Sequence, residues 1–131
     1  MPRKDNIMKT FEFEKYGKKY NMRLQLLSYP NDNLAIQMLH CEDEEWEIWN
    51  VLTVNLGDTR PLNCAYIDTN NNGREILSWI VRHGLAVPTG HTATSGFCTY
   101  SEYRFRPEIL KEADPEGYLL YLNKQKARHN T

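Results

Sequence analysis

Cysteine is scarce in this chain of 131 residues, and the few cysteines present form no recognisable pattern. Cys41, Cys64 and Cys98 are odd in number, contain no CxxC pair and follow no recognisable signal peptide. A disulfide framework needs paired cysteines and an oxidising compartment. We therefore expect a reduced protein in the cytoplasm.

Long apolar runs and an excess of one charge are missing as well. No run approaches the ~20 apolar residues that a membrane span requires, so we expect no membrane association. The formal net charge is −1, from 16 basic and 17 acidic residues, which disfavours direct sequence-specific nucleic-acid binding. The length and the 40% hydrophobic content predict one folded domain over residues 1–131, with a flexible leader over 1–7 and a frayed tail over 125–131.

Catalytic and metal-binding signatures are also lacking. There is no phosphate-binding glycine loop, dinucleotide fingerprint or EF-hand spacing. Asp68, His91 and Cys98 are the residue types of a thiol hydrolase, but their order and spacing match no known signature. A zinc site is disfavoured because the neighbouring His40 and Cys41 would point to opposite faces of a strand. We expect no enzyme, no cofactor and no metal.

One helix stands out, and it lies in the middle of the chain. Possible capping side chains precede a single apolar stripe, which consists of Ile76, Leu77, Ile80 and Val81. Gly84 then provides a stop signal ahead of Pro88. We predict a central helix over about residues 71–84, in which Gly73 is the weakest position.

Alternating apolar and polar residues predict strands on both sides of this helix. One hairpin is expected over residues 11–26 with its turn at 16–18, and a second over 34–56 with a bulge near Trp49-Asn50. A strand at 64–67 precedes the helix, and a last strand is expected over 97–105. A short helix over 108–112 and a C-terminal helical segment from Tyr118 complete the chain. The fold class is α+β, with an antiparallel sheet of about five or six strands and the central helix packed on one face.

An acidic run lies at the turn of the second hairpin. It is followed closely by two tryptophans, and the whole candidate surface consists of Glu42, Asp43, Glu44, Glu45, Trp46, Glu47 and Trp49. Charge runs are usually solvated surface, and a hairpin tip in water explains this one. The alternative is a contact surface for a basic partner, with the aromatic side chains as anchors. Both tryptophans also fit a place in the core.

The segment over residues 88–96 has no apolar periodicity and is rich in hydroxyl groups and glycines. It fits an ordinary irregular loop; the alternative is a ligand site in which backbone N–H groups at Thr89-Gly90 and Ser95-Gly96 hold a phosphate. The corresponding ligand site would consist of Asn70, Asn71, Asn72, Thr89, Gly90, His91, Ser95, Tyr100 and Tyr103. The tyrosines would stack on a base and the asparagines would contact its polar edges.

Five blocks of the sequence resemble a known family. They read NDNLAIQM (31–38), LTVNL (52–56), CAYIDTNNN (64–72), GLAVPTG (84–90) and SGFCTYSEYRF (95–105). As a set, over about residues 29–110, they are similar to the family catalogued as domain of unknown function 4313, which is carried by mobile elements of gut bacteria. The first hairpin and the segment after Asp114 lie outside the best match.

This resemblance implies a biological setting, because small proteins of conjugative elements and phages often counter host defences. Our leading hypothesis is an anti-CRISPR or other anti-defence protein that inhibits a host defence nuclease, most plausibly a CRISPR-Cas effector, by direct protein binding. One alternative is a binder or sponge of a nucleotide-derived defence signal at the loop over 88–96. Another is an accessory protein of a mobile element without an inhibitory role.

Overall fold

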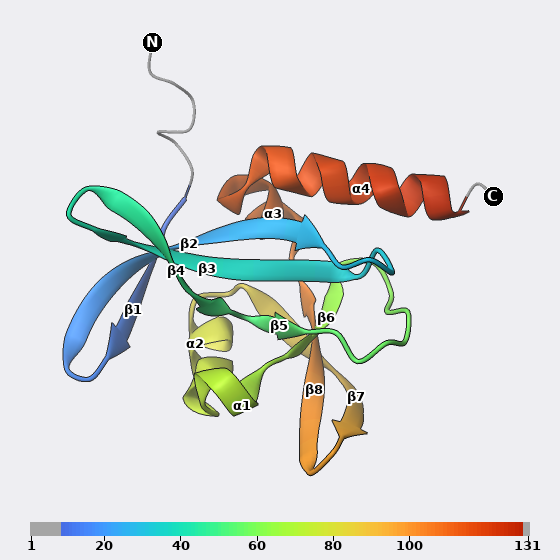
Figure 1. Cartoon of the computed structure of the whole chain (residues 1–131), viewed down its shortest axis with the longest axis horizontal. Coiled ribbons are helices and arrows are strands. Elements are labelled where there is room, and N and C mark those ends of the chain that lie inside the picture. The colour runs from blue at the N-terminus through green and yellow to red at the C-terminus, as the bar shows by residue number, and fades with distance from the viewer. Residues whose placement is uncertain (1–8, 130–131) are drawn as a thin grey trace.

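The computed structural model describes residues 9–129 as strands, helices and short connections (Figure 1). The strands are β1 (Phe11–Lys15), β2 (Lys18–Ser28), β3 (Leu34–Glu42), β4 (Glu45–Val51), β5 (Thr53–Val54), β6 (Cys64–Ile67), β7 (Ala86–Ser95) and β8 (Cys98–Phe105). The helices are α1 (Thr69–Asn72), α2 (Glu75–Arg82), α3 (Pro107–Ala113) and α4 (Pro115–His129). The leader that we expected over residues 1–7 lies outside the described residues.

The strands form two antiparallel sheets of four strands each, in the orders β1-β2-β3-β4 and β5-β6-β8-β7. The α+β class with antiparallel strands and a C-terminal helix is confirmed, although the strands occupy two sheets instead of one sheet of five or six. The chain changes sheets at Leu52, whose N–H donates to the carbonyl of Ile36 at 2.8 Å and whose carbonyl accepts from the N–H of Asp68 at 2.9 Å. Leu52 therefore joins the two sheets through the backbone.

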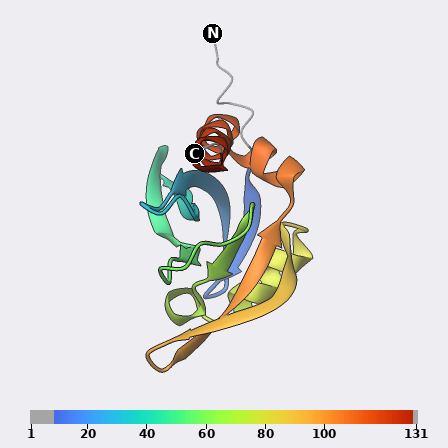
Figure 2. The ribbon, with the colours of Figure 1, turned by 90° about the vertical axis from the view of Figure 1, so that its right-hand side faces the viewer.

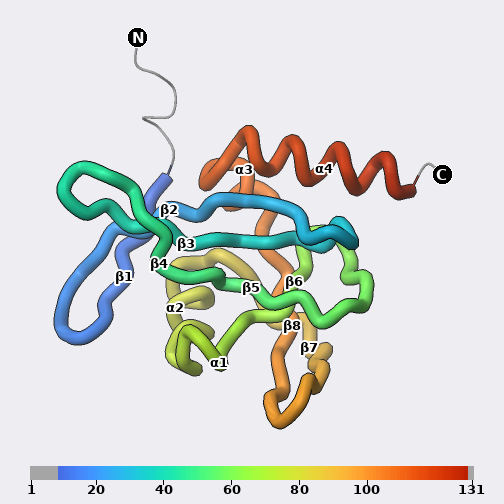
Figure 3. Tube along the Cα trace, viewed as in Figure 1, coloured from blue at the N-terminus to red at the C-terminus, as the bar shows by residue number. Residues whose placement is uncertain are grey.

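Alternation along the first hairpin fills the core, as we expected. Phe11 and Phe13 of β1 face inward with Met22, Leu24 and Leu26 of β2, and each is at most 5% exposed. The turn lies at Tyr16-Gly17, where both residues have positive φ. In Figures 1 and 3 this hairpin and the β3–β4 hairpin extend to the end of the molecule farthest from the C-terminus.

The prediction of a single helix over about residues 71–84 is wrong in one respect. The chain forms two short helices there, α1 and α2. Asp68 caps α1 by accepting from the N–H of Asn71 at 3.0 Å. Gly73 then takes φ = 82°, which lies outside the helical region and separates α1 from α2. Ile76 and Ile80 of the expected apolar stripe point into the core together with Trp79, whereas Leu77 is half-buried and Val81 is 54% exposed.

The C-terminal helix is longer than the sequence indicated. Helix α3 begins at Pro107, as expected, and α4 follows directly and continues to His129. Residues 125–129, for which we expected a frayed tail, are helical because Gln125 is buried and donates to the carbonyl of Asp32 at 2.6 Å. Helix α4 lies across β2, and Figure 2 shows it end-on above the two sheets. Within residues 9–129, none of the helices has the length and apolarity needed to cross a bilayer.

Candidate functional site

The β3–β4 hairpin ends in a tight turn that carries the acidic run. Asp43 and Glu44 form the turn with φ of 51° and 68°, the backbone geometry of a hairpin loop whose twist matches its strands. The side chains of the run are all exposed to solvent. We define the acidic tip as Glu42, Asp43, Glu44, Glu45 and Glu47.

Like charges face each other across this hairpin. Glu42 lies directly opposite Glu45 in the β3–β4 ladder. Two carboxylates in that position repel each other and destabilise the pairing. Lys18 and Lys19 line a hollow of about 270 Å³ with Glu42 and Asp43, so basic groups lie beside the tip. Because the Glu42–Glu45 pair does not stabilise the hairpin, it indicates a role of the tip other than stability.

The structure separates the two tryptophans of the candidate surface. Trp46 lies on the exposed part of β4, where its side chain is 39% exposed and the guanidinium of Arg23 lies 5.0 Å from the centre of its ring. Trp49 instead packs against the core, with its ring centroid 5.7 Å from that of Phe13 and 4.8 Å from that of Tyr20. Trp46 is thus the tryptophan that a partner would contact more readily.

The phase slip near Trp49-Asn50 is a β-bulge, as the sequence predicted. Met38 pairs with Asn50 while the next residue of β3, Leu39, pairs with Ile48, so Trp49 is the extra residue. A bulge of this kind bends the strand and changes the direction of its side chains. It lies between the exposed tip and the junction at which the chain enters the second sheet.

The prediction of a loop over residues 88–96 is wrong, because most of this segment belongs to strand β7. β7 pairs with β8 in two stretches separated by an irregularity between Pro88 and Thr92. Thr89, Gly90 and His91 lie in this irregularity, where Gly90 takes φ = 91°. Thr92, Ala93, Thr94 and Ser95 are paired with β8, so their segment is an ordered edge strand.

The remaining members of the proposed ligand site make contacts within the fold. Asn72 is buried and its side-chain amide donates to the carbonyls of Val51 and Asp68, both at 2.9 Å. The amide of Asn71 donates to the Asp68 carboxylate at 2.8 Å. Tyr100 and Tyr103 are 8% and 7% exposed, which leaves little ring surface for stacking. A ligand site formed by these residues stays a prediction.

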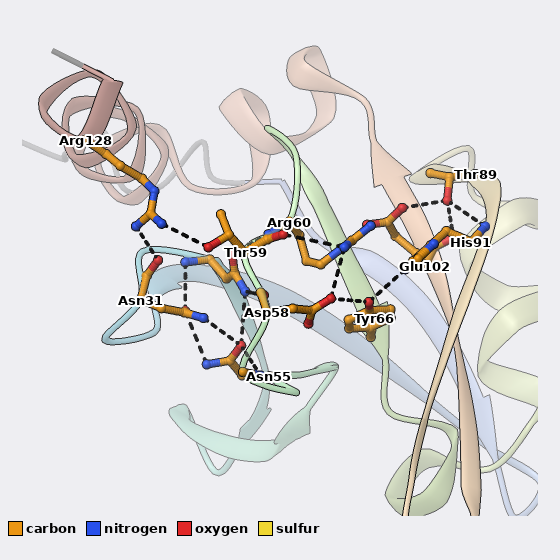
Figure 4. A network of polar contacts seen from close by, with 12 residues as sticks. Asn31, Asn55, Asp58, Thr59, Arg60, Tyr66, Thr89, His91, Glu102 and Arg128 are labelled. Carbon is orange, nitrogen blue, oxygen red and sulfur yellow. Dashed lines mark hydrogen bonds and ion pairs between the residues drawn. The ribbon is translucent and has the colours of Figure 1, made fainter. Parts of the chain in front are cut away.

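A polar network that we did not expect from the sequence joins the loop between β5 and β6 to β8 (Figure 4). Arg60 donates through Nε to the Glu102 carboxylate at 2.6 Å and through Nη1 to the Asp58 carboxylate at 3.0 Å. The Thr89 hydroxyl donates to the other oxygen of Glu102 at 2.7 Å. Tyr66 donates to Asp58 at 2.8 Å, and its hydroxyl lies 3.1 Å from Nε2 of His91.

The protonation states in this network are stabilised by their neighbours. Burial alone would raise the pKa of Glu102, but the hydrogen bonds from Arg60 and Thr89 leave that pKa below its usual value. Hydrogen bonding to Glu102 raises the pKa of Arg60. Burial and the hydrogen bond to Asp58 raise the pKa of Tyr66 to about 12. Arg60 and Glu102 therefore stay charged and Tyr66 stays neutral near neutral pH, which suits a structural role of these three groups better than proton transfer.

The burial of Glu102 is the feature that reveals this network. Glu102 pairs with Tyr66 on the face of the second sheet opposite the core residues Tyr103 and Phe105, yet it is only 3% exposed. A buried carboxylate requires a partner, and Arg60 follows a turn that is distant along the chain. Alternation along β8 is compatible with an exposed Glu102, so the sequence identifies neither this burial nor the cation that pairs with it.

Residues with metal-binding or nucleophilic side chains are dispersed. Over residues 9–129, His, Cys, Asp and Glu form no group of three or more that could hold a metal ion. The thiols of Cys41, Cys64 and Cys98 are free. The ring of His91 contacts Tyr66, with the two centroids 5.9 Å apart, so its Nε2 is engaged by a phenol.

Comparison with known proteins gave one match. Residues 23–125 match a family model described as "Domain of unknown function (DUF4313)". The matched region includes the acidic tip and the Arg60–Glu102 network, whereas β1 and the end of α4 lie outside it. No curated protein and no solved structure matches the chain.

Proposed function

The chain belongs to the DUF4313 family, and from this premise we propose that it is a non-catalytic counter-defence protein of a phage or another mobile element. In this proposal it acts in the cytoplasm of the bacterial host and inhibits a defence nuclease, a CRISPR-Cas effector, by binding that protein directly. The observation that carries the proposal is the acidic tip, a set of exposed carboxylates on an ordered hairpin.

The chemistry of the tip suits the surface that a nuclease uses for nucleic acid. Such surfaces hold phosphates with lysine and arginine side chains. Carboxylates at the end of a narrow hairpin can enter the same groove and compete for the same cations. Trp46, which lies next to the tip and is partly exposed, supplies an aromatic anchor of the kind that dominates many interfaces.

Two further observations support binding over catalysis. The Arg60–Glu102 network uses its groups in internal hydrogen bonds, and its tyrosine has a pKa of about 12, far from that of a proton donor or nucleophile at neutral pH. The Glu42–Glu45 pair destabilises the hairpin in isolation. A basic partner that binds the tip would relieve this repulsion.

Reversing three charges of the tip tests the proposal. The triple variant Glu44→Lys, Glu45→Lys, Glu47→Lys should fold, because Glu45→Lys replaces a repelling cross-strand pair by an attractive one. We expect it to lose at least about tenfold in inhibition, which corresponds to about 1.4 kcal/mol of binding free energy. The measurement is plasmid interference in cells that carry an active CRISPR-Cas effector, with thermal unfolding of the purified variant as the check on folding.

A matched control changes the same number of charges elsewhere. Glu12, Glu14 and Glu112 are exposed on β1 and α3, outside the β3–β4 hairpin. Their replacement by lysine should leave inhibition within about twofold of the wild type, since exposed substitutions usually have small effects. Equal inhibition by both folded triple variants would show that the acidic tip is not the contact surface.

A further inference from the structure

Helix α4 turns an apolar patch toward solvent. Its inward side chains, Tyr118 and Tyr121, are buried against the core, whereas Leu119 and Leu120 are 58% and 64% exposed. Beside them, α3 and α4 enclose a groove of about 610 Å³ to which Leu119 and Leu122 contribute. Two adjacent exposed leucines next to an apolar groove are typical of a surface that is covered in the functional protein.

Charges of opposite sign flank this patch at equal distances. Glu116, Leu120 and Lys124 occur at intervals of four residues, so they form one row on the exposed side of α4. Eight residues correspond to about 12 Å along a helix, so Glu116 and Lys124 are too far apart to pair with each other. Within residues 9–129 neither side chain forms an ion pair.

We propose that α4 is a dimer interface, in which a second copy of this chain lies antiparallel across the first. Along α4 the row reads Glu116, Leu120, Lys124. In a second, antiparallel copy the order is reversed, so acidic and basic side chains of the two copies face each other. With Leu120 on the two-fold axis, Glu116 of each copy faces Lys124 of the other. Leu119 of each copy then lies at the groove between α3 and α4 of its neighbour.

The symmetry of the charges identifies the second copy as the occupant. An isologous contact requires every residue pair to occur twice, and the Glu116–Lys124 pair meets that requirement around one central leucine. The antiparallel arrangement also opposes the two helix dipoles. Helix α4 is only about 22 Å long by its residue count, so the contact is small and the dimer weak.

The association state of the purified chain tests this inference, which is independent of the proposed function. Sedimentation velocity from low to high micromolar concentration should show a monomer that becomes a dimer as concentration rises. Leu120→Glu should raise the dissociation constant at least about tenfold. Ile48→Glu is the matched control, because Ile48 is 62% exposed on β4 and should leave the dimer unchanged.

Charge exchange provides a second and more specific test. Glu116→Lys alone and Lys124→Glu alone should each weaken the dimer, because each places like charges at both cross-pairs. A mixture of these two variants should form a heterodimer, in which both cross-pairs are again opposite in sign. A chain that stays monomeric throughout, a dimer that persists in Leu120→Glu, or a mixture without heterodimer would overturn the inference.

Discussion

Replacing Arg60 with methionine is expected to lower the free energy of unfolding at neutral pH by about 3–5 kcal/mol, because it leaves a buried carboxylate without its cation. The carboxylate is that of Glu102, whose side chain is 3% exposed and accepts from Nε of Arg60 at 2.6 Å. The Thr89 hydroxyl would remain as a hydrogen-bond donor to Glu102. One neutral hydrogen bond does not balance the loss of the ion pair.

Removing both partners isolates the contribution of the Arg60–Glu102 pair to the free energy of unfolding. The double variant Arg60→Met, Glu102→Met should recover much of the lost stability, since no unpaired charge is left in the interior. Urea denaturation of the wild type, the two single variants and the double variant gives this coupling free energy directly. A double variant less stable than Arg60→Met alone would show that Glu102 is not the unpaired buried charge that destabilises the single variant.

The same pair predicts a pH dependence. In the wild type the pKa of Glu102 is lower when folded, so its contribution to stability is present above the unfolded pKa and is lost as pH falls. In Arg60→Met, burial should raise that pKa, so the carboxyl takes up a proton on folding and the penalty disappears in acid. The stability gap should therefore be largest near neutral pH, begin to shrink as pH falls through the raised pKa of Glu102 in the variant, and shrink further below about pH 4.3, where the wild-type contribution is also lost.

Replacing Asp114 with alanine is the second change with a large expected effect, a loss of about 2–4 kcal/mol. Its Oδ2 accepts from the backbone N–H of Leu26 at 2.9 Å, and its Oδ1 accepts from the N–H of Gly117 at 3.1 Å. One carboxylate thus caps the start of α4 and holds that helix on β2. In the alanine variant the buried N–H of Leu26 has no acceptor.

Glu108→Ala is a suitable control for Asp114→Ala. Glu108 lies in the first turn of α3, and its side chain is exposed. We expect its removal to change the unfolding free energy by at most about 0.5 kcal/mol. Hydrogen exchange would add a local readout, with faster exchange of the α4 amides in Asp114→Ala. Equal unfolding free energies for the two variants would show that Asp114 does not hold the helix.

Features set by neighbouring residues could be predicted from the sequence. The first hairpin follows from strict alternation around Tyr16-Gly17, and α3 follows from proline at its first position. The bulge at Trp49 is visible as a change in the phase of alternation. Each of these depends on contacts between residues close in the chain, where side-chain period and turn chemistry act directly.

Features set by distant contacts could not be predicted in the same way. The division into two sheets depends on backbone hydrogen bonds of Leu52 to residues on either side in the sequence. Thr92 to Ser95 form a strand because β8 supplies their hydrogen-bond partners, although the hydroxyl-rich composition of this segment is typical of a loop. The sequence marks Gly73 as a weak position, but only its φ of 82° shows that the helix breaks there.

The sequence predicts that the acidic tip is an exposed surface, but it does not predict the contacts of the neighbouring tryptophans. Acidic residues around a turn indicate an exposed hairpin tip, and the structure places them there. The different positions of Trp46 and Trp49 depend on packing against β1 and β2, which the sequence does not show. The partner of the tip stays a prediction.

The central claim is that the protein binds a basic defence protein through the acidic tip, and co-purification tests it most directly. The tagged wild type and the Glu44→Lys, Glu45→Lys, Glu47→Lys variant would be expressed in a host with active defence nucleases, purified, and their bound proteins identified. We predict a nuclease subunit in near-equimolar amount with the wild type and a strongly reduced amount with the variant. Elution of the wild type without a nuclease, or equal capture by both proteins, would contradict the account.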